Sequence, residues 1–484
     1  HRDLHSFPTR RSSDLQGDTR LASLDVLFSQ GAQINFAVTS IKWPGVANLN
    51  VSIFSLSKGT RELDSFLNGK RVVIINPQFS DEPIFNNPEI LANNQNKVFN
   101  GSYYLGDGFV LNKDEKDAII KISKRNQDVI FPLLIGNDIN EKYDQSPTSY
   151  IINFFDWPIE KAATYPEPFI RIKELVKPFR DTNKRAVYRE KWWIYGERRV
   201  GLYNNLKKLN NCFVITATTK YLTLVKQETN KIFAKSLYVF TIDDFSTFSL
   251  CQSSIHELWA RKFSSTLADT LSYTPSTCFE TFPFPNRITN SQMDVLRQIG
   301  EVYHEFRKNT LLKHRQGLTK VYNAFHGRGI TEAIITIDLS KLDQKSFEKQ
   351  LGKEALYLWN HLQKTVGTCS FEEAVTGIIR LRELHVEMDN AVLEAYGWQD
   401  IDLRHDFYEV DYLPENDRVR FTIHPDARKE VLKRLLELNH KIHEEEMKAG
   451  LWDQKKTRKK RSEESDSNEN QVNEAEAGYG GLFG

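Results

Sequence analysis

Cysteine is scarce in this sequence, and the few cysteines follow no metal-binding or disulfide pattern. Four cysteines stand far apart among 484 residues, and none forms a CxxC pair. This spacing argues against a zinc knuckle and against a disulfide scaffold, and it favours reduced thiols in the cytosol. No uninterrupted apolar run is long enough to cross a bilayer, so we expect no membrane span. The proportions of hydrophobic residues (40%) and charged residues (27%) are typical of a globular protein.

Net charge is also nearly absent, yet the charges are unevenly distributed. The formal net charge is only +1. Between Arg171 and Lys220, however, there are thirteen Lys or Arg and four Asp or Glu, an excess of nine positive charges. The rest of the chain therefore carries a net charge of −8. Such a basic block favours a surface that binds a polyanion, and the alternative is a solvated basic helix face.

The first fifteen residues, HRDLHSFPTRRSSDL, fit neither of two familiar N-terminal or catalytic patterns. The opening HRDL is similar to a kinase catalytic loop, but that loop needs an Asn where this chain has Pro8. A signal peptide is excluded because no apolar core follows the positive charges. Back-translation gives a sequence that resembles an adapter oligonucleotide of short-read sequencing libraries. We therefore expect residues 1–15 to be adapter-derived and without native contacts, and the natural sequence to begin near Gln16, downstream of a missing part.

Residues 16–59 predict one helix and two strands. The helix LASLDVLFSQG ends at Gly31, and the bursts INFAVTSIKW and LNVSIFSL flank a turn at Pro44-Gly45. These elements cannot bury a core alone, so we interpret them as the C-terminal strands of a larger α/β domain. Residues 60–130 are interpreted as a connector that contains a strand, KRVVIINP, and a helix near Asp114–Arg125.

A second α/β domain is predicted for residues 131–290, where short strands such as CFVITATT and SLYVFTI alternate with segments rich in aromatic residues and proline. After that the pattern changes to apolar residues three and four positions apart, so residues 291–450 are expected to be helical. Residues 451–484 are charged and of low complexity, and we expect them to be disordered. Helix start and stop signals lie at Gly397, Pro425 and Gly450.

The segment KPFRDTNKRAVYREKWWIYGERR, which begins at Lys177, alternates cations with aromatic residues. Lys and Arg neutralise phosphates, and aromatic faces stack on unstacked bases. This pattern favours contact with a nucleic acid. The alternative is that the aromatic residues belong to the core beneath an amphipathic segment. For Trp192 and Trp193 together we expect one buried and one exposed side chain.

Two motifs favour turns over chemistry. The run from Asn76 to Phe79, NPQF, resembles the Asn-Pro-Pro-aromatic motif with which amino-methyltransferases hold a flipped base. Gln78 replaces the second proline, so a turn after a strand is the better interpretation. Gly106-Asp107-Gly108 is too short to cradle a phosphate, and it predicts a hairpin turn.

Two further pairs favour structural roles. His385 and Asp389 lie one helical turn apart, a spacing that suits a metal, but no third ligand accompanies them. A hydrogen bond on the helix surface is therefore the better interpretation. Asn137 and Asp138, in LIGNDIN, predict a structural cap, with orientation of a recognition loop as the alternative.

Longer phrases carry a resemblance to a known family. In chain order they are FAVTSIKWPGVANLNVSIFSL, LIGNDIN, VKPFR, EKWWIY, SSIHELW, TFPFP, YNAFH, LRELHVEMDNAVLEAYGW and RFTIHPDARKEVLKRLLELNH. Together they resemble the C-terminal two-thirds of a bacterial type IIG restriction-modification methyltransferase of the MmeI-like kind. The resemblance extends from Gln16 to about Lys448. Residues 326–377 look like an insertion, because a shorter link is expected there.

The resemblance implies a fold and a reaction. The fold is α/β: the C-terminal end of a Rossmann-like methyltransferase sheet, an α/β target-recognition domain, then an α-helical C-terminal region. The reaction transfers a methyl group from S-adenosylmethionine to the amino group of an adenine flipped out of double-stranded DNA. The family's aromatic-x-Gly-x-Gly loop and Asn-Pro-Pro-Tyr motif precede FAVTSIKWPG and are absent from this sequence. We therefore expect no catalytic, cofactor-binding or metal-binding residue here, and no activity of this chain alone.

In that family the target-recognition domain reads DNA in the duplex grooves. The expected setting is the bacterial cytoplasm, with the protein associated with the nucleoid. Two alternatives stay open: a stand-alone DNA-specificity subunit that acts with a separate catalytic chain, and a non-catalytic RNA-binding protein. The sequence upstream of Gln16 on the source DNA would separate the first alternative from a truncated methyltransferase. The residues expected to contact DNA are Arg180, Lys191, Trp193, Arg198, Arg199 and Lys220.

Overall fold

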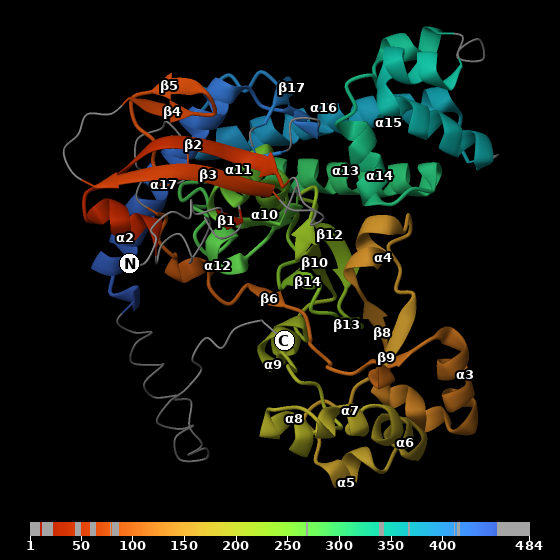
Figure 1. Cartoon of the computed structure of the whole chain (residues 1–484). Helices are drawn as coiled ribbons and strands as arrows, with labels where there is room; N and C mark the ends of the chain where they lie inside the picture. Colours follow the sequence, from red (N-terminus) through yellow and green to blue (C-terminus); the bar gives the residue numbers. More distant parts are fainter. Residues whose placement is uncertain are drawn as a thin grey trace.

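The computed structural model describes residues 10–11, 23–43, 50–58, 64–77, 79, 87–267, 270–337, 343–365, 368–410, 412–413 and 417–452. Along the chain, an N-terminal sheet is followed by a middle part with an upper and a lower lobe, and then by a helical part that crosses the top of the molecule (Figure 1).

The N-terminal sheet consists of β1 (Arg10–Arg11), β2 (Ala32–Lys42), β3 (Asn50–Lys58), β4 (Ser65–Leu67) and β5 (Lys70–Val72). Their order is β1-β3-β2-β4-β5, and of these neighbours only β2 and β4 are parallel. The buried residues Ile34 and Phe54 pack with Leu24 of α2 (Leu24–Ser29). Gly31 follows this helix with φ 86°, so the predicted helix, its end and the two long strands are confirmed. The strand predicted at KRVVIINP is shorter and ends at Val72.

β1 contradicts the expectation that residues 1–15 make no contacts. It pairs antiparallel with β3 opposite Ser52 and Val51. The outer edge of β3 presents unpaired backbone N–H and C=O groups, and an extended segment of almost any sequence satisfies them. The predicted Pro44-Gly45 turn lies outside the described residues.

The middle part, residues 87–286, contains two four-stranded sheets. The upper sheet has β6 (Val98–Asn100), β10 (Asn211–Thr216), β12 (Val225–Glu228) and β14 (Leu237–Phe240), in the order β12-β10-β14-β6. The lower sheet has β7 (Val110–Leu111), β8 (Ile130–Leu134), β9 (Ser149–Ile152) and β13 (Ile232–Phe233), in the order β13-β8-β9-β7. Both sheets thus draw strands from before residue 131, the border predicted between connector and second domain.

Short helices surround the lower sheet, and we call this assembly, residues 103–199 with β13, the lower lobe (Figure 1). Its core is separate from that of the upper sheet and contains Phe109, Phe154 and Ile172. A capping box between Asn112 and Glu115 opens the helix predicted near Asp114. The helices of the lower lobe are α3 (Lys113–Ile122), α5 (Ile159–Ala162), α6 (Pro166–Leu175), α7 (Lys177–Asp181) and α8 (Ala186–Glu190). Helix α4 (Gly136–Glu141) instead packs on β10 of the upper sheet and on α14, and α9 (Val200–Leu206) leads back to the upper sheet.

Beyond the upper sheet lies a small antiparallel sheet with the order β11-β16-β15, made of β11 (Thr218–Thr219), β15 (Ser265–Leu267) and β16 (Thr270–Ser272). The helices α10 (Phe245–Gln252), α11 (Ser254–Phe263) and α12 (Pro275–Cys278) accompany it. α10 is buried along nearly its whole length because it lies between the upper sheet and the helical part. We call the upper sheet, the small sheet and helices α9 to α12 the upper lobe. Its packing is continuous with that of the helical part.

The helical part is confirmed, and its ends follow the predicted signals. Gly397 ends the helix Phe371–Tyr396 with φ 74°. Pro425 occupies the first turn of the helix Pro425–Lys448, and Gly450 follows this helix with φ 68°. The segment predicted as an insertion, residues 326–377, contributes a helix that packs on its neighbours. The helices are α13 (Asn290–His314), α14 (Leu318–Phe325), α15 (Gln344–Lys364), α16 (Phe371–Tyr396) and α17 (Pro425–Lys448), and a hairpin is formed by β17 (Asp406–Glu409) and β18 (Val419–Thr422).

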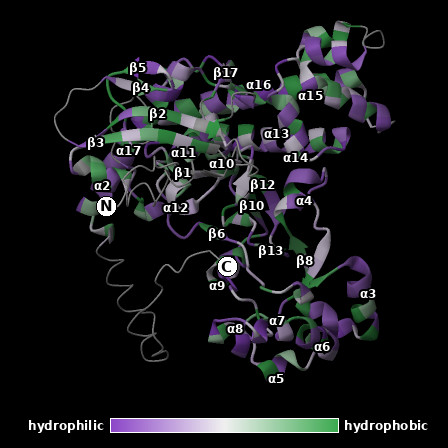
Figure 2. Cartoon of the chain, in the orientation of Figure 1, coloured by the Kyte–Doolittle hydropathy of each residue, from purple (hydrophilic) through white to green (hydrophobic). Residues whose placement is uncertain are grey.

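Figure 2 shows hydrophilic and hydrophobic residues interleaved along the long helices of the helical part. In the described part of the chain, no helix combines the length and the apolar character that a membrane crossing needs. The tail predicted to be disordered lies outside the described residues from 453 onward.

The prediction of a hairpin turn at Gly106-Asp107-Gly108 is wrong. The strands on either side, β6 and β7, belong to different sheets, and Asp107–Phe109 forms a short 3-10 helix. Gly108 is required by close approach, because a Cβ there would lie 2.5 Å from the Cβ of Leu175. The turn predicted at Asn76 is confirmed, since its carbonyl accepts a hydrogen bond from the Phe79 N–H at 2.9 Å.

Candidate nucleic-acid interface

The basic block begins in the lower lobe with α6, α7 and α8. A proline in the first turn opens both α6 and α7, where a missing N–H costs no helical hydrogen bond. Ile172, Val176 and Arg180 follow at four-residue spacing and are fully buried. This stripe therefore faces the lobe core, and the opposite side of the same helices is directed to solvent.

Arg180 is a structural anchor. Its guanidinium donates to the carbonyl oxygens of Tyr104 at 2.6 Å, Leu105 at 2.9 Å and Lys191 at 3.4 Å, and it lies 5.5 Å from the Phe109 ring centroid. Burial lowers the pKa of Arg180 to about 10, which leaves it charged at neutral pH. Because the side chain is 0% exposed, the expectation that Arg180 contacts DNA is corrected. Its role here is to hold the Lys191 end of α8 in place.

The two tryptophans both belong to the lobe core. Trp192 is buried, and Trp193 is half-buried rather than exposed. Their rings meet edge to face with centroids 6.0 Å apart. The Trp193 indole N–H donates to the Trp157 carbonyl oxygen at 2.8 Å, so one edge of this ring is already engaged. A base-stacking role for Trp193 is therefore restricted to the part of its ring that stays exposed.

Lys191 and Arg198 remain as free exposed cations among the predicted contacts. Both side chains are exposed, and neither has a hydrogen-bond or ion-pair partner within the described part of the chain. Arg199 is less available, because it pairs with Glu197 and donates to the Gly101 carbonyl oxygen at 3.4 Å. Its backbone adopts the left-handed region at φ 56° as it begins α9. Lys173, Lys184, Arg185 and Arg189 of the lobe are also exposed, as are the carboxylates Glu174, Asp181 and Glu190.

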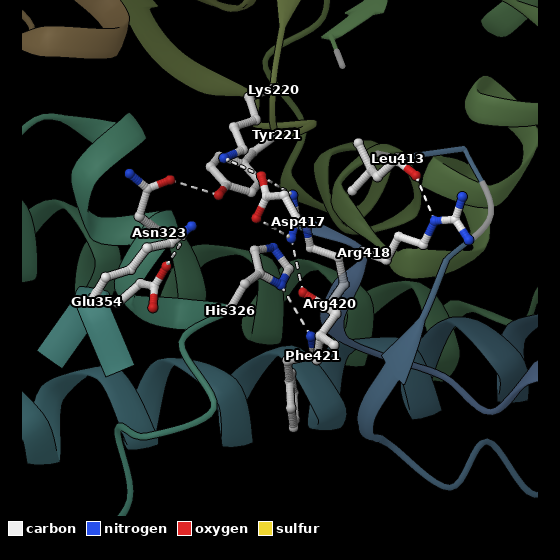
Figure 3. Close-up of polar contacts among 12 residues, drawn as sticks. Lys220, Tyr221, Asn323, His326, Glu354, Leu413, Asp417, Arg418, Arg420 and Phe421 are labelled. Atoms are coloured by element: carbon white, nitrogen blue, oxygen red, sulfur yellow. Dashed lines mark hydrogen bonds and ion pairs between the residues drawn. The ribbon is translucent and has the colours of Figure 1, made fainter. Parts of the chain in front are cut away.

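Lys220 lies elsewhere, where the upper lobe meets the helical part (Figure 3). Its Nζ lies 2.9 Å from Asp417 Oδ2, and Arg420 Nη2 lies 3.2 Å from the same oxygen. Burial raises the pKa of Asp417, but the hydrogen bonds from Arg420 and Lys220 outweigh it and hold that pKa below its ordinary value. Lys220 is thus paired with a carboxylate and does not continue the exposed surface of the lower lobe.

The neighbours of Lys220 tie three segments together (Figure 3). The Tyr221 hydroxyl donates to Asn323 Oδ1 at 2.7 Å, and the Tyr221 ring stacks on His326 with centroids 4.9 Å apart. The Phe421 N–H donates to His326 Nδ1 at 3.2 Å. The segment after β11, the C-terminal end of helix α14 and strand β18 are therefore joined here. The sequence could not reveal this arrangement, because the bonded residues are about 100 positions apart.

A second connection missed from the sequence runs along α17. Glu446 is buried, and its carboxylate accepts hydrogen bonds from the backbone N–H groups of Ala92 at 2.6 Å and Asn93 at 3.1 Å. The buried Asn439 accepts from the Glu89 N–H at 2.8 Å. The seven-residue spacing of Asn439 and Glu446 on an amphipathic helix placed both on one face, and this was the available signal. They fix the first residues of the middle part against α17.

His385 and Asp389 are buried rather than on a helix surface, which corrects the expectation. His385 Nε2 lies 3.1 Å from Ser254 Oγ, and Asp389 accepts from the Ser254 N–H at 2.8 Å and contacts His405 Nε2 at 2.8 Å. Asp389 and Ser254 approach the same ring nitrogen of His385, so the group is not a charge-relay triad. Within the described ranges, no group of three His, Cys, Asp or Glu side chains could hold a metal.

The structural cap predicted at Asp138 is confirmed. Asp138 is buried, and its carboxylate accepts from the Ile135 N–H at 3.2 Å and from the Thr148 hydroxyl at 2.8 Å. Asn137, its neighbour, is exposed.

The middle part is similar to a known protein domain. Residues 80–286 match the family model of the MmeI target recognition domain. This match supports a specificity domain of the restriction-modification kind, and it contains all six residues that we expected to contact DNA. No curated protein matches the chain.

One solved structure shows a shared fold. It is the type IIL restriction-modification enzyme MmeI, solved in complex with DNA, with a TM-score of 0.60 and 15% sequence identity. The match covers 90% of this chain and 49% of the MmeI chain, so the protein spans about half the length of that enzyme. The type IIG restriction endonuclease BpuSI also matches, with a TM-score of 0.27, 10% identity and coverage of 80% of this chain and 47% of that one.

Proposed function

We propose that this chain recognises double-stranded DNA as the specificity-determining part of a site-specific adenine methyltransferase of a restriction-modification system. The observation that carries the proposal is the coincidence of the target-recognition match, residues 80–286, with a lobe surface that carries unpaired exposed cations. Buried anchors such as Arg180 fix the backbone beneath that surface. A rigid surface with free cations suits a partner with regularly spaced phosphates.

The cations act first through charge. Lys191 and Arg198 neutralise phosphates and release condensed counterions, which gives affinity without sequence preference. Sequence preference requires side chains that reach base edges, and loops held between rigid strands are suited to this role. The positive surface thus aligns the duplex, and recognition follows once the lobe lies against a groove.

The resemblance implies S-adenosylmethionine as the methyl donor, but the residues present do not fit a site for it. The family's aromatic-x-Gly-x-Gly loop and Asn-Pro-Pro-Tyr motif are absent from the sequence. Asn76, in the run that resembles the second motif, is 1% exposed within a turn. We assign no step of methyl transfer to this chain. In the proposal a catalytic part outside these 484 residues flips the adenine and transfers the methyl group, either on the same polypeptide or as a separate chain.

Duplex binding at several salt concentrations tests the proposal. Reversing the two free cations, Lys191→Glu and Arg198→Glu, should weaken binding, and each lost phosphate contact should reduce the salt slope by about one. The matched control reverses two exposed lysines of α15, Lys345→Glu and Lys349→Glu, and should bind as the wild type does. Equal binding by all three proteins at every salt concentration would refute the assignment of the surface. Tighter binding to an RNA of the same sequence would favour the RNA-binding alternative.

A further inference from the structure

The lower lobe exposes apolar side chains that its own fold does not use. Leu175 and Phe179 are each 54% exposed. The Arg180 N–H donates to the Val176 carbonyl oxygen at 3.0 Å, so α7 continues the helical path of α6 across their junction. Residues four positions apart on such a path are neighbours on one face. Leu175, the exposed Pro178 and Phe179 therefore form one ridge, which we call the apolar ridge.

The ridge lies along the edge of the buried stripe, where the helix surface turns from the lobe core toward solvent. Phe179 makes no ring contact within the described part of the chain, whereas most other aromatic residues of the lobe do. An exposed phenylalanine beside an exposed leucine and proline is costly in water unless a partner covers it. The Cβ of Leu175 lies against Gly108, but more than half of Leu175 and of Phe179 stays exposed beside the buried Ile172 and Val176.

Charge identifies the partner. Exposed cations outnumber exposed carboxylates around the ridge, with Lys173 and Glu174 before it and Asp181, Lys184 and Arg185 after it. Lys177, within the ridge, is paired with Asp181 at 2.6 Å and adds little. The partner therefore carries negative groups that face these cations and an apolar part that faces the ridge. Duplex DNA has this character, because phosphates border grooves whose floors are stacked bases, and proteins enter it with Phe, Leu or Pro between base steps.

We propose that the apolar ridge is a wedge that inserts between adjacent base pairs from the minor groove and bends the duplex, with Phe179 as its tip. This proposal rests on the proposed DNA-binding function and deepens it. Bending at a base step costs least at flexible pyrimidine–purine steps, so the wedge would add sequence preference without a hydrogen bond to any base. The lower lobe would then read deformability as well as charge.

The test uses the full chain and a mixed-sequence duplex that carries donor and acceptor dyes at its ends. Wild-type protein should bind and raise energy transfer as the ends approach. Phe179→Ala should bind about tenfold more weakly, as expected when a stacking contact is lost, with little bending and an unchanged salt slope because no phosphate contact is removed. Phe179→Leu keeps an apolar tip and should retain most of the bending. The control Ile122→Ala removes another exposed apolar side chain, 68% exposed on α3, and should change nothing.

The outcomes separate the two proposals. Wild-type binding and bending that persist in Phe179→Ala would overturn the wedge and leave the DNA-binding function intact. Absence of duplex binding by the wild type would overturn both. Self-association that Phe179→Ala abolishes, with unchanged DNA bending, would show that a second copy of the chain covers the ridge, and this too would overturn the wedge.

Discussion

Acid should destabilise the protein through His256, a histidine buried at the base of the upper lobe. It lies on α11 and is 0% exposed. Its Nε2 lies 3.1 Å from the Tyr273 hydroxyl, the Phe282 ring meets it edge to face at 4.5 Å, and its Nδ1 has no hydrogen-bond partner in the described part. A proton added to this ring would be buried without a compensating charge, so burial lowers the pKa of His256 to about 3.

The direction of the effect follows from the two pKa values. Above pH 6.5 the ring is neutral in both the folded and the unfolded chain, so it contributes no pH dependence. Below pH 6.5 the unfolded chain binds a proton that the folded protein excludes, and the free energy of unfolding falls until the pH reaches about 3. The contribution of His256 to this slope approaches about 1.4 kcal/mol per pH unit, which amounts to roughly 2 kcal/mol lost between pH 6.5 and 4.5. Burial also lowers the pKa of His304 to about 3 and that of His314 to about 4, so these two residues steepen the wild-type slope further.

Urea unfolding at a series of pH values measures this slope. His256→Gln keeps a polar group near Tyr273 but does not titrate in this range. The variant should be less stable than the wild type at pH 7 because it packs less well against Phe282. Its stability should nevertheless fall less steeply with acid, by about 1.4 kcal/mol per pH unit. Parallel pH profiles for the two proteins would refute the claim that the buried ring excludes a proton.

Three further predictions concern residues whose roles the structure revised. Trp193→Ala should lower the free energy of unfolding by about 2–4 kcal/mol. If the melting curve instead matches the wild type and duplex binding weakens, Trp193 contacts DNA and does not support the lobe core. Arg180→Met should cost about 3 kcal/mol or more, because three buried carbonyl oxygens lose their donor, and unchanged stability in denaturant would contradict that role. A double-mutant cycle on Lys220→Ala and Asp417→Ala should give a coupling energy below about 1 kcal/mol for the free energy of unfolding, since both side chains are about one-quarter exposed. The same cycle measured on duplex affinity should give a coupling energy near zero.

Local signals in the sequence were sufficient to predict much of the secondary structure. The helix of residues 24–29, the long strands that follow it and the helices of the C-terminal part carry glycine stops, proline starts and clear periodicity. The same signals failed where pairing partners are distant. The lower sheet joins β13 to β8 in parallel across about 100 residues, and no local pattern specifies such a pair.

The candidate site was predictable as a region but not residue by residue. The excess of positive charge, residues 171–220, falls within residues 80–286, which match the target recognition domain model. Charge counting does not distinguish an exposed cation from one whose donors face backbone carbonyls, so Arg180 was assigned to the surface although it is buried. Lys220 was grouped with the lobe because Asp417, its partner, is remote in the sequence.

Selection from a pool of random duplexes tests the central claim most directly. The purified chain should enrich one short, defined sequence, and Lys191→Glu with Arg198→Glu should reduce the total DNA retained without changing which sequence is enriched. Such a result would show that this chain reads duplex sequence in the absence of any catalytic part. Retention of DNA with no enriched sequence, at a level that falls to zero in moderate salt, would contradict the account and leave only a non-specific basic surface.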